Sequence, residues 1–108
     1  MLSMKDRRKL AEEFARQLKE KHGDRIQRVI LFGSVARGED VKDSDVDLLV
    51  VTRDTSWAFR KSLAGEAAEV LMREGVYISA KPIPPEGFSR TEDTIFGRNV
   101  RKEGLVLA

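Results

Sequence analysis

The stretch of sequence that decides the fold is RVILFGSVARGEDVKDSDVDLLVVT, residues 28–52. It opens with a short apolar run containing β-branched side chains, residues 28–32, and Gly33 ends that run. This pattern is typical of a buried strand rather than a helix. We expect a short helical turn over residues 34–38 and a second, strongly apolar strand over residues 45–52. The stretch therefore predicts two buried strands that are connected by a glycine turn and a polar loop.

The segment before this stretch predicts a helix over residues 3–21. Ser3 followed by Asp6 resembles a capping box, and Gly23 can end the helix. Apolar side chains recur every four residues, at Leu10, Phe14 and Leu18. Because that spacing places them on one face, we expect the helix to pack on one side.

A second long helix is expected over residues 54–74, with Gly75 as its stop. Its aromatic side chains, Trp57 and Phe59, are expected to pack this helix in the core rather than to stack on a nucleotide base. The single histidine, His22, is expected to be a helix-end residue that interacts favourably with the helix dipole.

The remainder of the chain predicts one more strand and a last helix. Residues 76–83 alternate between two faces, and the prolines around them favour a strand at the edge of a sheet. The last helix is expected over residues 92–102, ending at Gly104. The order helix, strand, strand, helix, strand, helix suits a small α/β (α+β) domain. Its helices would pack mainly on one face of a small mixed sheet, in a single domain over residues 1–108.

The composition excludes several classes of site and location. The chain has no cysteine and one histidine, which rules out disulfides, thiolate metal sites and histidine-rich zinc sites. Any bound metal would then sit on carboxylates, and this favours Mg²⁺ or Mn²⁺. A formal net charge of +2 is no nucleic-acid signature. With no apolar span and no N-terminal signal, we expect a cytoplasmic protein that does not enter the membrane.

Two aspartates, Asp45 and Asp47, are the candidate metal ligands and catalytic residues. Side chains at positions i and i+2 of a strand point the same way, with Cα atoms roughly 6.6 Å apart. Two carboxylates on one face of an apolar strand are costly unless a positive charge joins them, so a divalent metal is expected there. Metal sites of this kind clamp the attacking and leaving oxygens in phosphoryl transfer.

The glycine-serine turn fits a phosphate ligand at the same place. Gly33 at the end of a strand lets the backbone approach a phosphate, and the helix start that follows offers free N–H groups. Ser34 adds a hydroxyl donor. Arg37 and Lys42 can add positive charge, although Arg37 equally fits a solvated surface residue.

Each half of this pattern has a bland alternative. A glycine-serine pair after a strand is commonly an ordinary turn, and an Asp-x-Asp pair at a strand start is commonly a solvated edge or a helix cap. Other phosphate and metal motifs do not fit. The lysine of a P-loop does not follow Gly38, and Leu48 stands where a calcium loop needs glycine. The combination is far more specific than either half.

Together, Gly33-Ser34, the Asp-x-Asp pair that follows after ten intervening residues, and the surrounding SDVDLLV resemble the minimal nucleotidyltransferases of the DNA polymerase β superfamily. The resemblance covers nearly the whole chain, including FGRNVRKEG near its end. It implies a polymerase β-like core and Mg²⁺-dependent transfer of a nucleoside monophosphate, AMP from ATP, to an acceptor hydroxyl. It assigns metal binding to Asp45 and Asp47 and nucleotide binding to Gly33 and Ser34, to which we add Arg37 and Ser44.

The resemblance also implies a partner, since small domains of this kind are commonly antitoxins paired with helical HEPN-type toxins. A homo-oligomer is compatible with it, and a small-molecule acceptor is a weaker option. One feature departs from the pattern: the superfamily usually adds a third carboxylate from a later strand, where this chain has Ser79 or Tyr77. Two hypotheses therefore stand. The chain is either an enzyme that nucleotidylates a partner, or a nucleotide- or metal-binding module that neutralises a partner by binding it.

Overall fold

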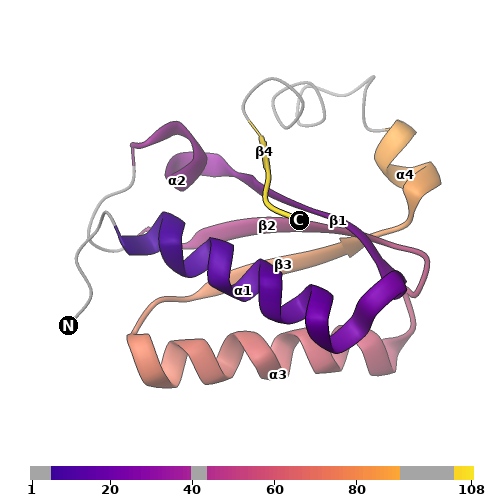
Figure 1. The fold of residues 1–108 in the computed structure, drawn as a ribbon, viewed down its shortest axis with the longest axis horizontal. Helices are drawn as coiled ribbons and strands as arrows, with labels where there is room; N and C mark the ends of the chain where they lie inside the picture. Colours follow the sequence, from indigo (N-terminus) through magenta and orange to yellow (C-terminus); the bar gives the residue numbers. More distant parts are fainter. Residues whose placement is uncertain (1–5, 40–43, 91–103) are drawn as a thin grey trace.

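The computed structural model describes residues 6–39, 44–90 and 104–108. Helices alternate with the strands of one sheet along the chain (Figure 1). In chain order the elements are α1 (Asp6–His22), η1 (Gly23–Arg25), β1 (Ile26–Phe32), α2 (Gly33–Arg37), β2 (Val46–Thr52), α3 (Trp57–Glu74), β3 (Ile78–Ile83), α4 (Pro85–Arg90) and β4 (Leu105–Val106).

The four strands form one mixed sheet in the order β3-β2-β1-β4. Strand β2 lies antiparallel to β1 and parallel to β3, and β4 adds antiparallel to the other side of β1. Two backbone hydrogen bonds join Val29 to the last residues. The Leu107 N–H donates to the Val29 carbonyl at 2.8 Å, and the Val29 N–H donates to the Ala108 carbonyl at 3.2 Å. The predicted small mixed sheet is confirmed, and so is the edge position of the proline-containing strand.

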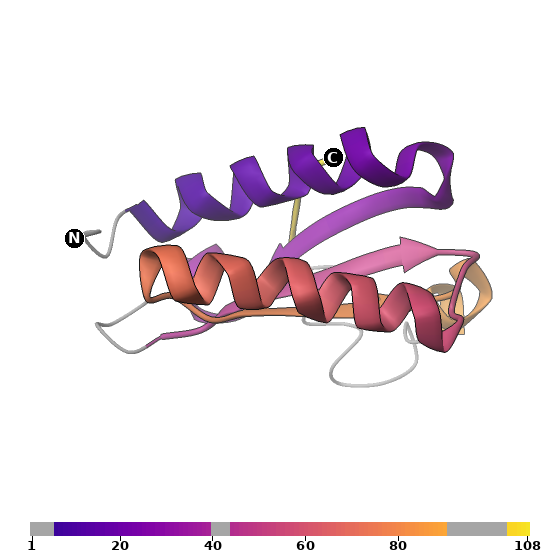
Figure 2. The ribbon, with the colours of Figure 1, turned by 90° about the horizontal axis from the view of Figure 1, so that it is seen from below.

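The two long helices run side by side over one face of this sheet (Figures 1 and 2). The main core lies between them and the sheet. It includes Leu18 of α1, Leu31 of β1, Leu48 of β2 and Leu63 of α3, each at most 1% exposed. The opposite face carries a smaller apolar cluster, in which Phe88 of α4 packs against the sheet. The expected arrangement of helices mainly on one face is confirmed.

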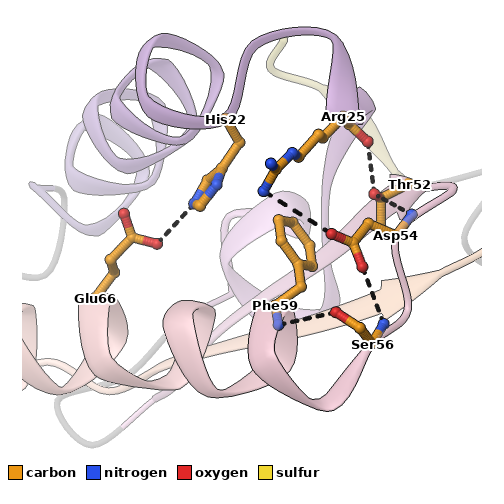
Figure 3. A network of polar contacts seen from close by, with 7 residues as sticks. All are labelled: His22, Arg25, Thr52, Asp54, Ser56, Phe59 and Glu66. Atoms are coloured by element: carbon orange, nitrogen blue, oxygen red, sulfur yellow. Dashed lines mark hydrogen bonds and ion pairs between the residues drawn. The ribbon is translucent and has the colours of Figure 1, made fainter.

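Helix α3 begins where side chains satisfy its first backbone groups. Ser56 accepts a hydrogen bond from the Phe59 N–H at 3.2 Å, and Asp54 accepts one from the Ser56 N–H at 3.1 Å. Hydrogen bonds from the side chain and the backbone of Ser56 hold the pKa of the Asp54 carboxyl below its usual value. Thr52 in turn donates to the Arg25 carbonyl, which ties the end of β2 to η1 (Figure 3). The helix therefore starts three residues after the predicted position 54.

Several predicted boundaries shift, and three elements are new: η1, α4 and β4. The strands begin at Ile26, Val46 and Ile78 rather than at positions 28, 45 and 76. The expected capping box at Ser3 and the expected helix over residues 92–102 lie outside the described residues. Helix α4 was not expected because its prolines were attributed to a strand end, whereas Pro85 opens a helix. Strand β4 is too short to leave a periodic pattern in the sequence.

Among the helices that the structure describes, none is long and apolar enough to cross a membrane.

Candidate active site

Asp47 lies on the face of β2 that α1 and α3 leave uncovered. Its neighbours across the sheet are Phe32 on β1 and Ser79 on β3. The side chain is half-buried. Burial raises the pKa of the Asp47 carboxyl, the Lys81 ammonium opposes that rise, and the Asp45 carboxylate adds to it. A partly desolvated carboxylate beside a second negative charge is an environment that a cation would stabilise.

Asp45 sits just before β2 rather than within it, which corrects the expected strand start. Its side chain is exposed, and its negative charge is close enough to Asp47 to affect that carboxyl's pKa. The hydrogen bond from Val46 N–H to the Tyr77 carbonyl, at 2.9 Å, marks the point where regular pairing with β3 begins. The structure thus brings the two predicted aspartates together, although only Asp47 is fixed by the sheet.

Gly33 is the predicted site residue whose local geometry is most demanding. It begins α2 directly after β1 and has a φ of +80°, in the left-handed region that favours glycine. A Cβ added to Gly33 would lie 2.6 Å from Asp47 Oδ2. The glycine therefore serves two purposes at once: it makes the sharp turn into α2 and leaves room for the Asp47 carboxylate.

The remaining predicted nucleotide ligands lie on α2 and directly before Asp45. Ser34 lies in the first turn of α2 and is half-buried. Arg37, in the last turn of α2, donates from Nε to Glu39 Oε2 at 3.2 Å, so it is a surface ion pair in this structure. Ser44 is half-buried just before Asp45. Lys42 lies outside the described residues.

Two further residues shape the site and were not assigned to it from the sequence. Arg7 of α1 is 7% exposed and donates from Nε to the Ser44 carbonyl at 3.0 Å, which anchors the backbone that leads into β2. Nothing in the sequence marks this contact. Lys81 lies on the same face as Asp47 and two residues beyond Ser79. Strand alternation already placed Lys81 on that face, so this signal was present in the sequence.

The residues present fit a hard divalent cation. Asp45 and Asp47 offer carboxylate oxygens, the donor type that Mg²⁺ and Mn²⁺ prefer. No group of three or more His, Cys, Asp or Glu side chains gathers within residues 6–39, 44–90 and 104–108. Ser79, and not Tyr77, is the strand neighbour of Asp47, so Ser79 stands beside Asp47 where the third acid was expected.

The single histidine lies away from this site and has a structural partner. His22 ends α1, and its side chain is 7% exposed. Its Nε2 lies 3.1 Å from Glu66 Oε2 on α3, and its ring meets the edge of Phe59 at 4.9 Å between centroids (Figure 3). Lys21 Nζ lies 3.2 Å from the other oxygen of the same glutamate. The helix-end position of His22 is confirmed, and its contacts join the two long helices.

The aromatic side chains of α3 divide between the core and the surface. Phe59 is 4% exposed, as expected of a core residue. Trp57 is 73% exposed, so the expectation that it packs in the core is wrong. The Lys61 ammonium lies 5.0 Å from the centre of the Trp57 ring.

Comparisons with known proteins match most of the chain to one family. A model of the family described as "Nucleotidyltransferase domain" matches residues 11–100. A curated protein of Methanocaldococcus jannaschii, named "Putative protein adenylyltransferase MJ0604", is 38% identical over 99 residues, covering 92% of this chain and 95% of that protein.

Solved structures share the fold. A chain of a toxin-antitoxin complex with AMP-PNP aligns with a TM-score of 0.63 at 22% identity, covering 90% of this chain and 72% of that one. A chain from a complex of a tri-AMPylated Shewanella oneidensis HEPN toxin with an MNT antitoxin aligns with a TM-score of 0.57 at 21% identity. It covers 93% of this chain and 71% of that one. At these identities the likeness is one of fold.

Proposed function

This chain belongs to the nucleotidyltransferase domain family, and from that premise we propose that it transfers AMP from ATP to a hydroxyl group on a partner protein. In this reaction the acceptor oxygen bonds to the α-phosphorus while the bond from that phosphorus to the bridging oxygen breaks. Pyrophosphate leaves, and the hydroxyl proton is released to solvent or to a base.

The observation that carries this proposal is the contact between Gly33 and Asp47. A backbone turn without a side chain lies against a half-buried carboxylate, and a second carboxylate, Asp45, stands beside it. A phosphate binds well where backbone N–H groups are accessible at a glycine turn, and a metal ion binds well to paired carboxylates. The glycine turn after β1 and the carboxylates at the start of β2 would thus together meet both requirements of a metal-nucleotide complex.

The residues divide into roles by position. Asp45 and Asp47 would hold Mg²⁺ or Mn²⁺, and Gly33 and Ser34 would bind the triphosphate on the β1 side. A bound divalent ion would neutralise the charge of the triphosphate and polarise the reacting phosphoryl group. Ser44, directly before Asp45, would contribute to nucleotide binding. Arg37 is held by Glu39 through its Nε, and its guanidinium would add positive charge beside the nucleotide.

A protein acceptor is supported by two kinds of relative. The curated relative carries the name of a protein adenylyltransferase, and the structural neighbours include an MNT antitoxin in complex with a HEPN toxin. We propose a helical HEPN-type protein as partner and acceptor, so that this chain acts as the antitoxin of such a pair in the cytoplasm.

The proposal is tested first by binding. Mn²⁺-ATP should bind to the parent chain, and the double variant Asp45→Asn, Asp47→Asn should not bind it. Both changes are nearly isosteric, so circular dichroism should report an unchanged fold. Equal calorimetric affinity in parent and double variant would rule out the assigned site. Transfer is then followed with ATP labelled with ³²P at the α-phosphate, together with the product of the neighbouring gene.

A second candidate function has one observation in its favour. Asp47 has Ser79 rather than a carboxylate as its β3 neighbour, and a hydroxyl that is neutral at physiological pH cannot take up the acceptor proton as a carboxylate can. The chain would then bind a metal-nucleotide complex and neutralise its partner by association. Tight association with the neighbouring product, without label transfer at any metal concentration, would favour this function.

A further inference from the structure

Large exposed apolar side chains are concentrated on α3 and shortly after its end. In the described part of the chain, those most exposed for their size are Trp57 at 73%, Leu71 at 42%, Met72 at 87%, Tyr77 at 47% and Val106 at 63%. The first three belong to α3, and Tyr77 follows shortly after its end. Such a gathering on a small domain marks an interaction surface.

Trp57 and Leu71 belong to a stripe along the outer face of α3. Positions 57, 61, 64, 68 and 71 recur at helical spacing, and they are occupied by Trp57, Lys61, Ala64, Ala68 and Leu71. All five are exposed. The opposite face of the helix packs on the sheet through Phe59, Leu63, Ala67 and Val70. Helix α3 therefore buries one apolar face, and its outer stripe, apolar except for Lys61, is left exposed by the part of the chain that the structure describes.

A groove runs beside the stripe, between α3 and the edge strand β3. It has a volume of about 300 Å³, and its walls include Ala64, Ala68 and Leu71 from the helix and Tyr77 and Pro82 from the strand side. The small alanines let another backbone approach closely at the middle of the helix, and the larger side chains lie towards its ends.

We propose that this outer face of α3 is an interface with a second copy of the chain, in which the two α3 helices pack antiparallel. The stripe has Trp57 at its N-terminal end and Leu71 at its C-terminal end, where Met72 and Tyr77 are exposed beside it. A two-fold axis near the helix centre places each Trp57 against the apolar group of the other copy and brings the alanines together. Antiparallel packing also opposes the helix dipoles favourably.

The charges along α3 complement each other in the same arrangement. Arg60 and Lys61 lie near the N-terminal end, whereas Glu69, Arg73 and Glu74 give the C-terminal end a net negative charge. The two-fold axis brings the basic end of one helix to the acidic end of the other. Arg60, which also lines the groove, then lies about 3 Å along the helix axis from Glu74 of the second copy, at 1.5 Å per residue. The proposal does not depend on the nucleotide site.

The mass in solution tests this proposal directly. Sedimentation equilibrium of the parent should give twice the 12.2 kDa of one chain at micromolar concentration and a monomer on dilution. Ala68→Arg places a charge at the centre of the interface and should weaken association by about 100-fold or more. Ala58→Arg is the matched control, because it makes the same change at an exposed position outside the stripe. A monomeric parent at all concentrations would overturn the proposal, as would equal weakening by both variants.

The absence of cysteine allows the orientation to be tested by crosslinking. In an antiparallel pair with its two-fold axis near position 66, the two copies of Ala64→Cys lie about 6 Å apart along the helix, at 1.5 Å per residue. Leu71→Cys of the two copies would be about 15 Å apart by the same rise. Oxidation should therefore link Ala64→Cys into a covalent dimer and leave Leu71→Cys unlinked. Efficient linking of Leu71→Cys would show a parallel contact and refute the arrangement.

Trp57, as the only tryptophan, reports on the same interface by fluorescence. Its emission should shift to shorter wavelength as concentration rises, with the midpoint that sedimentation gives. Ala68→Arg should remove this shift, and Ala58→Arg should keep it. A shift that is independent of concentration would contradict burial of Trp57 between copies.

Discussion

Replacing Gly33 by alanine should separate the two purposes of this glycine. The residue has a φ of +80°, and an added Cβ would lie 2.6 Å from Asp47 Oδ2. Gly75, the residue that ends α3, has a similar φ of +72°, and a Cβ there would meet no atom of the described residues within 4 Å. Gly75→Ala is therefore the matched control: it carries the backbone strain alone.

The shared backbone strain has a known size. A non-glycine residue in the left-handed region costs about 1–2 kcal/mol, so both variants should lose about that much unfolding free energy. For a domain near this size, that lowers the melting temperature by roughly 4–8 °C for each kcal/mol. The contact with Asp47 adds little to the folding cost of Gly33→Ala, because the carboxylate is the end of a side chain and can move aside.

The two variants should differ in ligand binding instead. In Gly33→Ala the Asp47 carboxylate must leave the position that faces the turn, and the new methyl group occupies that space. We expect at least a tenfold loss of Mn²⁺-ATP affinity by calorimetry, larger than the loss of about 1 kcal/mol for Ser34→Ala, which removes one hydrogen bond. Gly75→Ala should bind as the parent does. Unchanged affinity in Gly33→Ala would refute the assignment of this turn to the nucleotide.

Three further variants and one control variant test other parts of the site. Burial raises the pKa of the Asp47 carboxyl above its unfolded value, so its ionised form destabilises the fold; Asp47→Asn should stabilise the chain at neutral pH in urea titrations. The stability gained by Asp47→Asn should vanish as pH falls through the raised pKa of the folded chain to the pKa of the unfolded chain. A gain in stability that grows on acidification would contradict this prediction. Arg7→Met removes the donor to the Ser44 carbonyl and should cost about 1–3 kcal/mol of stability, together with nucleotide affinity. Ser79→Asp supplies a carboxylate beside Asp47 and should raise label transfer by about 10²- to 10⁴-fold, whereas Ile78→Asp, at 1% exposure, should unfold the chain by circular dichroism.

The sequence alone determined the local pattern of the site. The β2 strand, the turn at Gly33 and the alternation that puts Ser79 and Lys81 on one face of β3 were all readable, because side-chain direction in a strand follows from the backbone period of two. The inner face of α3 was readable for the same kind of reason, since Phe59 begins a helical repeat of apolar residues. Periodic and local features of this kind require no knowledge of the partner surface.

Only the tertiary structure decided which of these features meet. Arg7 holds the Ser44 carbonyl across 37 residues of chain, and Gly33 lies against Asp47 because β1 and β2 pair in one particular register. Trp57 shows most clearly what the sequence could not decide. Helical spacing places apolar residues on both the inner and the outer face of α3, but the sheet covers only the inner face. Contacts between distant residues depend on how whole elements pack, and packing leaves no period in the sequence.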